Sequence, residues 1–394
     1  MRILEVIPTY LPATRYGGPI LSTHALAKAL VERGNRVEVY TTYGGQNGKS
    51  GRLPPAITEI DGVTVNYFLP DRMPRLSWAP KLAHKLKTEI RNFDIVHLHT
   101  VFQWPTWKAA QLARTHGIPY IISPRGMLVQ DLIRRRNRLV KSVWNQLIEK
   151  KNLKLAAAIH VTSAREAADL ENLNWNLPKL VNIPNGVEWL EPEGSVSPEI
   201  RDIANRLPYA LFFGRLTWKK GLDTLLHAFA GTGLGYLVIA GTDDEGLSNS
   251  LRQLAGKLGI EQRVHIVART VSGVDRYQLF RSARMFVLPS YSENFGNVVL
   301  EALASQLPVI VTPEVGAAEI VLEADAGFVV PKDPIAIGSR IESLMLDEQA
   351  AKRMGTAGQQ YVGKNCSWHS VAASMEQLYQ TCASEASRSH TKSN

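Results

Sequence analysis

Short apolar runs alternate with helix-length amphipathic segments along almost the whole chain, and this alternation constrains the fold more than any other feature of the sequence. Apolar runs of this kind are typical of strands buried on both faces of a sheet. A helix-length segment between two such strands is typical of a βαβ unit. The pattern therefore predicts an α/β protein built from parallel sheets.

The predicted strands form two series. The first occupies residues 3–7, 37–41, 63–68, 95–99, 120–123, 159–162 and 180–183, and the second occupies 210–213, 236–240, 264–267, 285–288, 309–311 and 327–330. A polar, acidic and turn-rich stretch at 186–199 separates the two series. Helices are predicted at 20–33 and 107–116. A closing helix is predicted at 367–382, followed by a frayed polar tail.

The length of the chain agrees with more than one domain. At about 150 residues per domain, 394 residues make two or three domains. We predict two doubly wound domains of similar size. The first contains residues 1–184 plus 368–394, with the closing helix crossing back to it, and the second contains residues 185–367.

Composition limits the partners and the compartment. Lys and Arg number 45 against 36 Asp and Glu, a formal net charge of +9, which favours phosphate-bearing partners such as nucleotides, nucleic acids or an anionic membrane surface. The two cysteines form neither a disulfide framework nor a metal-binding pair. No apolar run approaches the length of a membrane span, and the first residues do not resemble a signal peptide. We therefore expect a cytoplasmic location.

Candidate binding residues should follow strands, because two facing doubly wound domains form a ligand cleft at the carboxyl ends of their strands. Gly17 and Gly18 come after the first strand and open the helix from Ile20. Glycines there let backbone N–H groups approach a phosphate or a sugar. A plain turn with Pro19 at the first helical position explains the same residues, and the dinucleotide fingerprint GxGxxG is absent.

Two cations follow the first strand of the second series. Arg215 comes directly after Gly214, and Lys220 precedes the helix from Leu222. A planar guanidinium and a compact ammonium suit two neighbouring phosphate groups. Either residue alone reads more simply as a solvated surface cation, and it is their joint position at a strand end that favours a diphosphate site.

Two carboxylates surround the start of a later helix. Glu293 lies in the loop after strand 285–288, and Glu301 lies eight residues further, inside the helix that starts at Asn297. Carboxylate oxygens accept hydrogen bonds from vicinal hydroxyl groups. Asn294, Phe295 and Gly296 lie between, and their backbone amides suit an oxygen-rich group.

Together these residues resemble glycosyltransferase family 4, whose members are retaining enzymes with the GT-B fold of two Rossmann-like domains. The resemblance covers nearly the whole chain. It rests on the ordered combination of Gly17 and Gly18, Asn185-Gly186-Val187, Arg215 with Lys220, the pair Glu293 and Glu301, and Gly316 with Glu319.

The resemblance implies a role for each motif. It implies that Arg215 and Lys220 clamp the donor diphosphate, that Glu301 binds ribose, and that Glu293 faces the donor sugar. Arg269 falls where such enzymes meet the edge of the base, although relatives commonly have glycine at the preceding position, which is Ala268 here. The loop residues Gly17, Gly18, Asn294, Phe295 and Gly296 complete the implied donor site.

The first domain is implied to hold the acceptor side. His97 and His99 match the HxH pattern of the family, and His99 is the implied site residue. Metal binding by two histidines on one face of a strand is possible in geometry, but with no third ligand in view hydrogen bonding is favoured and no metal is expected. Arg125 stands where many relatives have histidine, so it can bind a phosphate but cannot act as a base.

The implied activity is transfer of a sugar from a nucleoside diphosphate to an acceptor hydroxyl, with retained anomeric configuration and without a cofactor. Lys220, Arg215, Glu293 and His99 are the implied catalytic residues, and bacterial exopolysaccharide, lipopolysaccharide or lipid-linked glycan synthesis is the implied setting. A GT-B nucleotide-sugar epimerase, a glycogen-type synthase and a non-catalytic nucleotide-sugar sensor are the alternatives. The acidic stretch Asp243-Asp244-Glu245 resembles a metal motif, but its composition favours a turn or a helix start.

A basic amphipathic segment lies at residues 133–155. Its cations outnumber its one acid, Glu149, and its apolar residues lie on one helical side. Docking on an anionic inner membrane surface is one interpretation, and packing of the apolar side into the first domain is the other. Trp144 suits both. No nucleic-acid recognition motif accompanies the charge, so nucleic acid is not an expected partner.

Overall fold

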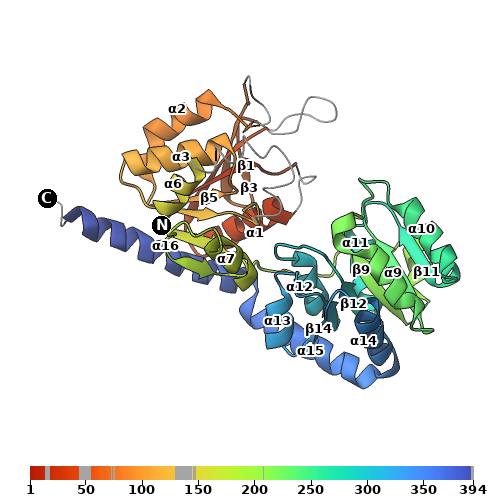
Figure 1. The fold of residues 1–394 in the computed structure, drawn as a ribbon. Helices are drawn as coiled ribbons and strands as arrows, with labels where there is room; N and C mark the ends of the chain where they lie inside the picture. Colours follow the sequence, from red (N-terminus) through yellow and green to blue (C-terminus); the bar gives the residue numbers. More distant parts are fainter. Residues whose placement is uncertain are drawn as a thin grey trace. The chain divides into compact units, whose positions relative to one another are not determined.

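The computed structural model describes residues 1–13, 18–43, 55–71, 73, 76–128, 144, 148–206 and 208–391. The chain divides into two compact units (Figure 1). Unit 1 contains Met1–Gly186 and Trp368–Asn394, and unit 2 contains Val187–Ser367. Each unit is an α/β domain around its own sheet, as the alternating pattern of the sequence predicts.

The sheet of unit 1 runs in the order β3-β4-β2-β1-β5-β6-β7-β8. All neighbouring pairs are parallel except β3 with β4, which form an antiparallel hairpin at one edge. The strands are β1 (Arg2–Thr9), β2 (Arg36–Thr42), β3 (Ile57–Ile60), β4 (Val63–Phe68), β5 (Ile95–His99), β6 (Tyr120–Ser123), β7 (Ala158–Val161) and β8 (Leu180–Asn182).

Helices cover both faces of this sheet (Figure 1). Alternate residues of β1 point to opposite faces, so that Ile3 packs with Leu26 and Met375, whereas Leu4 packs with Leu82 and Leu86. The first face is covered by α1 (Gly18–Glu32) and α16 (Trp368–Thr391), and the second by α2 (Pro80–Glu89) and α3 (Trp104–Thr115). Unit 1 also contains η3 (Ile90–Asn92), α6 (Lys150–Lys154) and α7 (Ala164–Glu171).

The sheet of unit 2 is parallel throughout, in the order β11-β10-β9-β12-β13-β14. Its strands are β9 (Tyr209–Phe213), β10 (Tyr236–Ala240), β11 (Val264–Val267), β12 (Met285–Leu288), β13 (Val309–Val311) and β14 (Gly327–Val329). Its helical segments are α8 (Pro198–Ala204), η5 (Trp218–Lys220), α9 (Leu222–Ala230), α10 (Ser248–Lys257), η6 (Glu261–Arg263), α11 (Gly273–Ser282), α12 (Asn297–Ala304), α13 (Ala318–Glu323), α14 (Pro334–Leu346) and α15 (Glu348–Asn365).

The predicted strands all occur, and two features of unit 1 differ from the sequence-based expectation. The strand β3 was not predicted, because its four residues are partly exposed and lack the apolar run of the central strands. The prediction of a frayed tail after residue 382 is wrong, since α16 continues to Thr391. Each residue added to an existing helix gains one backbone hydrogen bond, and Ser384 and Ser387 also bond back to carbonyls of the preceding turn.

Both sheets contain a point at which the strand order reverses. In unit 1 this switch lies between β1 and β5, and in unit 2 it lies between β9 and β12. The loops that leave two such strands run to opposite sides, which opens a crevice at the carboxyl ends of the strands. Side chains on these loops are therefore the ones that the fold presents to a ligand.

Gly221, in the loop after β9, lies against the loop after β12 at the unit 2 switch. It has a φ of +64°, and a Cβ atom at this position would lie 2.1 Å from the carbonyl oxygen of Pro289. Only glycine avoids both the left-handed backbone penalty and this overlap.

Gly221→Ala should therefore lower the free energy of unfolding by at least about 1–2 kcal/mol, the usual penalty for a left-handed backbone with a side chain. The measurement is urea denaturation of the full chain. Gly256→Ala is the matched control, because Gly256 lies within α10 and has open space around it, and alanine should be neutral or stabilising there. A Gly221→Ala variant as stable as Gly256→Ala would contradict this account.

Candidate active site

Lys220 and Glu293 meet at the switch point of unit 2. Lys220 ends the short helix η5 after β9, and Glu293 lies in the loop after β12. The Lys220 ammonium donates a hydrogen bond to Oε2 of Glu293, and both side chains are mostly buried, 16% and 24% exposed. Arg215, on the same loop as Lys220, is exposed. The structure thus brings two residues together that are 73 positions apart in the sequence.

The loop that carries Glu293 is fixed by the backbone of its neighbour, the loop after β13. The Glu293 N–H donates to the carbonyl of Glu314 at 3.0 Å, and the Gly316 N–H donates to the carbonyl of Glu293 at 3.1 Å. A Cβ atom on Gly316 would lie 2.0 Å from the carbonyl oxygen of Asn294. Glycine at 316 is therefore required for the close approach that holds Glu293 in place.

The helix α12 begins directly after this loop. Gly296 is its N-cap, with a φ of +90° and no side-chain cap hydrogen bond, while Phe295 beside it is buried. The first N–H groups of a helix have no partners within the helix, and the helix dipole makes this end electropositive. The start of α12, without a side-chain cap, therefore follows directly on the loop that carries Glu293.

Glu301, one turn inside α12, has a cation as its partner. Its Oε2 accepts a hydrogen bond from the guanidinium of Arg276 on α11. That guanidinium also lies over two aromatic rings, 5.1 Å from the ring centroid of Phe213 and 5.8 Å from that of Trp189. One carboxylate oxygen of Glu301 is thereby bound.

Arg276 is a site residue that sequence reasoning missed. A single arginine within a helix carries no spacing signal, and only the packing of α11 against β9 and its neighbours brings it to Glu301. The predicted base-edge residue, Arg269, follows β11. Its exposed guanidinium bonds Glu199 on α8 at 2.6 Å.

The acidic stretch after β10 forms a helix start. The carboxylate of Asp243 accepts hydrogen bonds from the backbone N–H groups of Leu247 and Ser248, at 2.7 and 2.9 Å. Both oxygens are used in fixing the turn before α10. The arrangement agrees with the turn interpretation of this stretch.

In unit 1, His97 belongs to a chain of buried hydrogen bonds whose direction can be assigned. At one end, Nε2 of His160 lies 2.9 Å from the carbonyl oxygen of Ile183, which can only accept. His160 Nδ1 must then accept from the hydroxyl of Ser123, and Ser123 must accept from Nε2–H of His97, each at 2.7 Å. His97 Nδ1 finally accepts from the hydroxyl of Tyr379 at 2.7 Å.

Burial keeps the histidines of this hydrogen-bond chain neutral. Burial lowers the pKa of His160 to about 3, and it lowers the pKa of His97 well below the ordinary value. Tyr379 belongs to α16, so the chain also fastens the last helix to the sheet. His97 is therefore a structural residue, with both ring nitrogens in use.

His99 and Arg125 lie together at the carboxyl ends of β5 and β6. The Nη2 group of Arg125 lies 3.3 Å from Nδ1 of His99, and its Nη1 donates to Oδ1 of Asn185 at 2.8 Å. The imidazole of His99 is fully buried, while Arg125 is partly exposed. Arg125 has a φ of +56°, a strained conformation for a residue with a side chain and one that is common at functional sites.

Among the described residues, the group with the geometry for a metal centre is Glu5, His97 and His99, whose ligand atoms all lie within 4.8 Å of one another. The hydrogen bonds leave this cluster poor in lone pairs. Both nitrogens of His97 are engaged, and Nδ1 of His99 faces the cation Arg125. A divalent ion needs several free donor atoms and is repelled by an adjacent guanidinium, so these residues do not fit a metal.

Some predicted residues lie outside the described part of the chain. They are Gly17 and most of the basic segment, namely its residues 133–143 and 145–147. Gly18 is the first residue of α1. Within the basic segment, the Trp144 indole N–H donates to the buried carboxyl group of Glu149 at 2.7 Å, and its ring packs edge-on against Trp107. Trp144 therefore packs against the protein.

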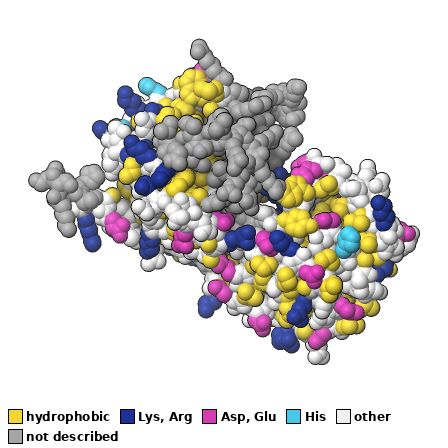
Figure 2. All heavy atoms as spheres, in the orientation of Figure 1, with side chains coloured by type: hydrophobic (Ala, Val, Ile, Leu, Met, Phe, Trp, Pro, Cys, Tyr) yellow, Lys and Arg dark blue, Asp and Glu magenta, His cyan; other side chains and the backbone are white. Residues whose placement is uncertain are grey.

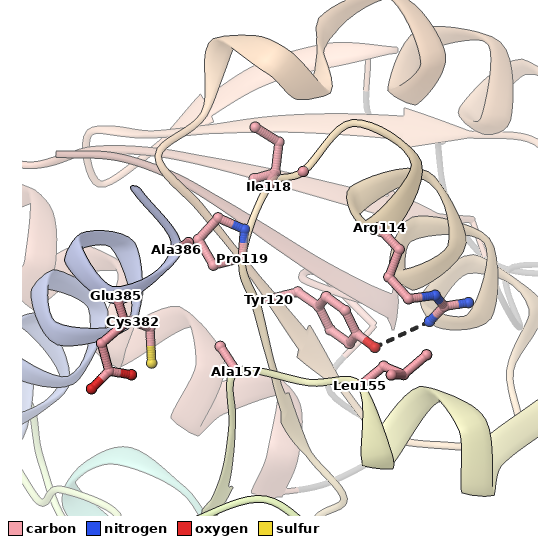
Figure 3. Close-up of a pocket in the computed structure, with 10 residues that line it drawn as sticks. Arg114, Ile118, Pro119, Tyr120, Leu155, Ala157, Cys382, Glu385 and Ala386 are labelled. Atoms are coloured by element: carbon pink, nitrogen blue, oxygen red, sulfur yellow. Dashed lines mark hydrogen bonds between the residues drawn. The ribbon is translucent and has the colours of Figure 1, made fainter. Parts of the chain in front are cut away.

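A hollow of about 400 Å³ lies at the opposite, amino-terminal edge of the unit 1 sheet (Figure 3). It lies beside the first residues of β6 and β7 and the α16 residues Cys382 and Glu385. Its cation, Arg114, donates a hydrogen bond to the Tyr120 hydroxyl (Figure 3) and another to Oδ1 of Asn152. Burial raises the pKa of the Cys382 thiol to about 11, so the thiol is not a nucleophile at neutral pH.

Comparison with known proteins agrees with this geometry. Residues 17–186 match the family described as "Glycosyl transferase 4-like domain", and residues 196–361 match "Glycosyl transferases group 1". The two matches cover most of unit 1 and nearly all of unit 2. The chain therefore belongs to the glycosyltransferases of the family 4 type, enzymes with a GT-B fold that act on nucleotide sugars.

Individual relatives are distant but match over most of their length. An uncharacterized glycosyltransferase of Methanocaldococcus jannaschii is 27% identical over 96% of this chain and 98% of its own. A GDP-mannose:cellobiosyl-diphosphopolyprenol alpha-mannosyltransferase of Komagataeibacter xylinus is 26% identical over 84% of this chain and 81% of its own. Among solved structures, sucrose-phosphate synthase of Thermosynechococcus elongatus superposes with a TM-score of 0.73 at 22% identity, covering 96% of this chain and 98% of its own.

Proposed function

We propose that this enzyme transfers a sugar from a nucleoside diphosphate to an acceptor hydroxyl with retention of the anomeric configuration and without a metal ion. The observation that carries the proposal is the meeting of Lys220 and Glu293 at the switch point of unit 2, beside the uncapped start of α12. A cation, a carboxylate and the electropositive start of a helix in one place suit a sugar diphosphate.

In this proposal Lys220 and Arg215 bind the diphosphate, and Glu301 binds the ribose hydroxyls. Each acid already has a cationic partner, Arg276 for Glu301 and Lys220 for Glu293. Arg276 occupies Oε2 of Glu301, which leaves Oε1 to accept from a hydroxyl. On donor binding Lys220 exchanges part of its contact with Glu293 for a phosphate oxygen.

The proposed reaction breaks the bond between the anomeric carbon and the diphosphate oxygen and forms a bond from that carbon to the acceptor oxygen on the same face. The departing phosphate oxygen takes the proton of the acceptor hydroxyl, so no enzymic nucleophile is needed. Negative charge grows on the diphosphate as the bond stretches, and preorganised cations stabilise that state more than the ground state. Lys220, Arg215 and the start of α12 thereby take the place that a metal ion has in other transferases.

Lys220→Ala should reduce kcat/KM by about 10²–10³-fold, the usual effect of removing one preorganised electrostatic contact. The measurement is release of nucleoside diphosphate from a panel of UDP, GDP and ADP sugars with acceptor present. Lys219→Ala, which removes the neighbouring cation on the same short helix, is the control and should remain within about twofold of the wild type. Equal activity of the two variants would remove Lys220 from the clamp.

Retention and metal independence are tested on the product. Proton NMR of the first product formed should show the same anomeric configuration as the donor sugar, and excess EDTA should leave the rate unchanged. An inverted product would require a base on the opposite face of the sugar, which this proposal does not contain. Loss of activity with EDTA and recovery with Mg²⁺ or Mn²⁺ would contradict the metal-free mechanism.

We further propose that the acceptor is a growing bacterial surface polysaccharide or a lipid-linked glycan. The relative from Komagataeibacter xylinus, by its name, mannosylates a diphosphopolyprenol-linked sugar, which supports a lipid-linked acceptor. A nucleotide-sugar epimerase and a non-catalytic binding protein are not favoured by the comparisons. A sensor would bind the donor without turnover, so product formation separates it from the transferase.

A peripheral association with an anionic membrane belongs to the same proposal, together with a cytoplasmic location. None of the helices in the described ranges is long and apolar enough to span a bilayer. Figure 2 shows Lys and Arg side chains gathered over α2, α3 and α6 on one face of unit 1. Lys151, Lys154 and Leu155 are exposed there, beside a polar hollow of about 460 Å³ that includes Arg114. Exposed cations next to an apolar side chain suit an anionic lipid surface.

A double variant, Lys151→Glu with Lys154→Glu, should lower partitioning to vesicles of phosphatidylglycerol and phosphatidylcholine by at least about tenfold, because each basic residue near an anionic surface contributes about 1 kcal/mol. The measurement is co-sedimentation with those vesicles and with neutral vesicles. Lys257→Glu with Lys364→Glu, both exposed in unit 2, makes the same change in net charge elsewhere. Equal partitioning of the wild type to neutral and anionic vesicles would contradict the membrane proposal.

A further inference from the structure

Glu5 is an acid in the middle of the unit 1 sheet for which neither the motifs nor the proposed mechanism has a use. It lies on β1 directly opposite His97 of β5 in the parallel register, and it is fully buried. Neither carboxyl oxygen has a hydrogen-bond partner among the described residues. A buried carboxyl group without partners weakens a fold, since nothing replaces the water that it has lost.

The atom that Glu5 faces is Nε2 of His99, at 3.7 Å from Oε2. The hydrogen bonds around His99 settle where its proton lies. The hydroxyl of Thr23 lies 3.4 Å from Nδ1 of His99 and can donate or accept, whereas Arg125 can only donate. Nδ1 of His99 must therefore be an acceptor, and the proton of the neutral ring is on Nε2. Nε2 is itself buried without a partner among the described residues. The N–H group of His99 and the carboxyl group of Glu5 are therefore adjacent and otherwise unused.

We propose that Glu5 is a positioning residue of the active site: its carboxylate attracts the Nε2–H group of His99, while Arg125 bonds Nδ1 on the other side of the ring. The consequence is a row of three side chains, Glu5, His99 and Arg125, each fixing the next. Arg125 is the partly exposed end of the row, held also by Asn185. The expected effect of Glu5 on turnover rests on the proposed sugar transfer, whereas its expected effect on His99 does not.

The charges around Glu5 determine when this row forms. Burial raises the pKa of Glu5 to about 8, and the positive charge of Arg125 opposes that rise. The other titratable groups that face Glu5 are Tyr10, directly after β1, His97 and His99 on β5, and Tyr379 on α16. The histidines are neutral because burial lowers their pKa values, so Arg125 is the one cation in this described set. Attraction of His99 Nε2–H by Glu5 therefore strengthens as the pH rises through about 8.

The raised pKa of Glu5 also makes the stability of unit 1 depend on pH. Between pH 4.5 and about 8 the folded state keeps a proton on Glu5 that the unfolded state has lost. The stability of unit 1 therefore falls as the pH rises through this interval. A residue that lowers stability where it favours activity is expected of a functional group and not of a packing residue.

The test compares Glu5→Gln with Glu38→Gln in the full chain. Glu38 is a buried acid on the neighbouring strand β2, paired with Arg36, and it lies outside the site. ¹⁵N NMR of histidine-labelled protein should show His99 as the Nε2–H tautomer in all three proteins, because Arg125 fixes it. The Nε2 signal of His99 should shift as the pH rises through about 8 in the wild type and in Glu38→Gln, and it should stay constant in Glu5→Gln. The His99 signals are assigned by their loss in His99→Gln.

The kinetic arm uses the same variants. Glu5→Gln should lower kcat by about 10- to 100-fold, the usual effect of a misplaced site group, with the KM for the donor unchanged. It should also lose the rise in wild-type turnover near pH 8, and its melting temperature should depend less on pH between 5 and 8. Wild-type turnover and pH profile in Glu5→Gln would overturn the proposal, and so would a His99 Nε2 signal that still shifts with pH as it does in the wild type. Reduced activity with a lower melting temperature at pH 8 would assign Glu5 a structural role instead. A wild type that transfers no sugar would refute the proposed function, and the NMR comparison would still decide the role of Glu5.

Discussion

The common direction of the parallel strands is the constraint on which the chemistry of each unit depends. Parallel strands place all their carboxyl ends at one edge of the sheet, and a reversal in strand order opens that edge to a ligand. In unit 2 the reversal between β9 and β12 brings Lys220 to Glu293. In unit 1 the reversal between β1 and β5 brings Glu5 to His99. Neither pair is close in the sequence.

The site residues of unit 2 are organised by opposite charge and by glycine. Each of the two acids is paired with a cation at a place where water is partly excluded. Gly221 and Gly296 adopt left-handed backbone conformations at the starts of α9 and α12. These features fix the loops before any ligand arrives, so little reorganisation is needed when charge develops on a diphosphate.

The fold could be predicted from the sequence to a large extent, because buried parallel strands are short apolar runs and long-range contacts are not needed to find them. The edge strand β3 lacked that signal, and the end of α16 depended on propagation from a helix already packed on the sheet. Both corrections concern segments whose structure depends on neighbours more than on their own composition.

The candidate site was less predictable than the fold. Motif residues such as Lys220 and Glu301 stand in recognisable spacing, so they could be proposed from the sequence. Arg276 and Glu5 could not, since a single charged residue in a helix or strand has no pattern of its own. Their partners come from other elements, and only the packed structure brings them together. His97 differs again, because its pattern suggested a site whereas its hydrogen bonds make it structural.

The central claim is that unit 2 binds the nucleoside diphosphate through Lys220, with Glu301 on the ribose. A crystal structure of the chain with UDP or GDP bound, the nucleotide being chosen by its measured affinity, tests this most directly. The account predicts a phosphate oxygen within hydrogen-bonding distance of the Lys220 ammonium and ribose hydroxyls on the Glu301 carboxylate. A nucleotide bound elsewhere, with the Lys220–Glu293 and Arg276–Glu301 pairs intact, would contradict it.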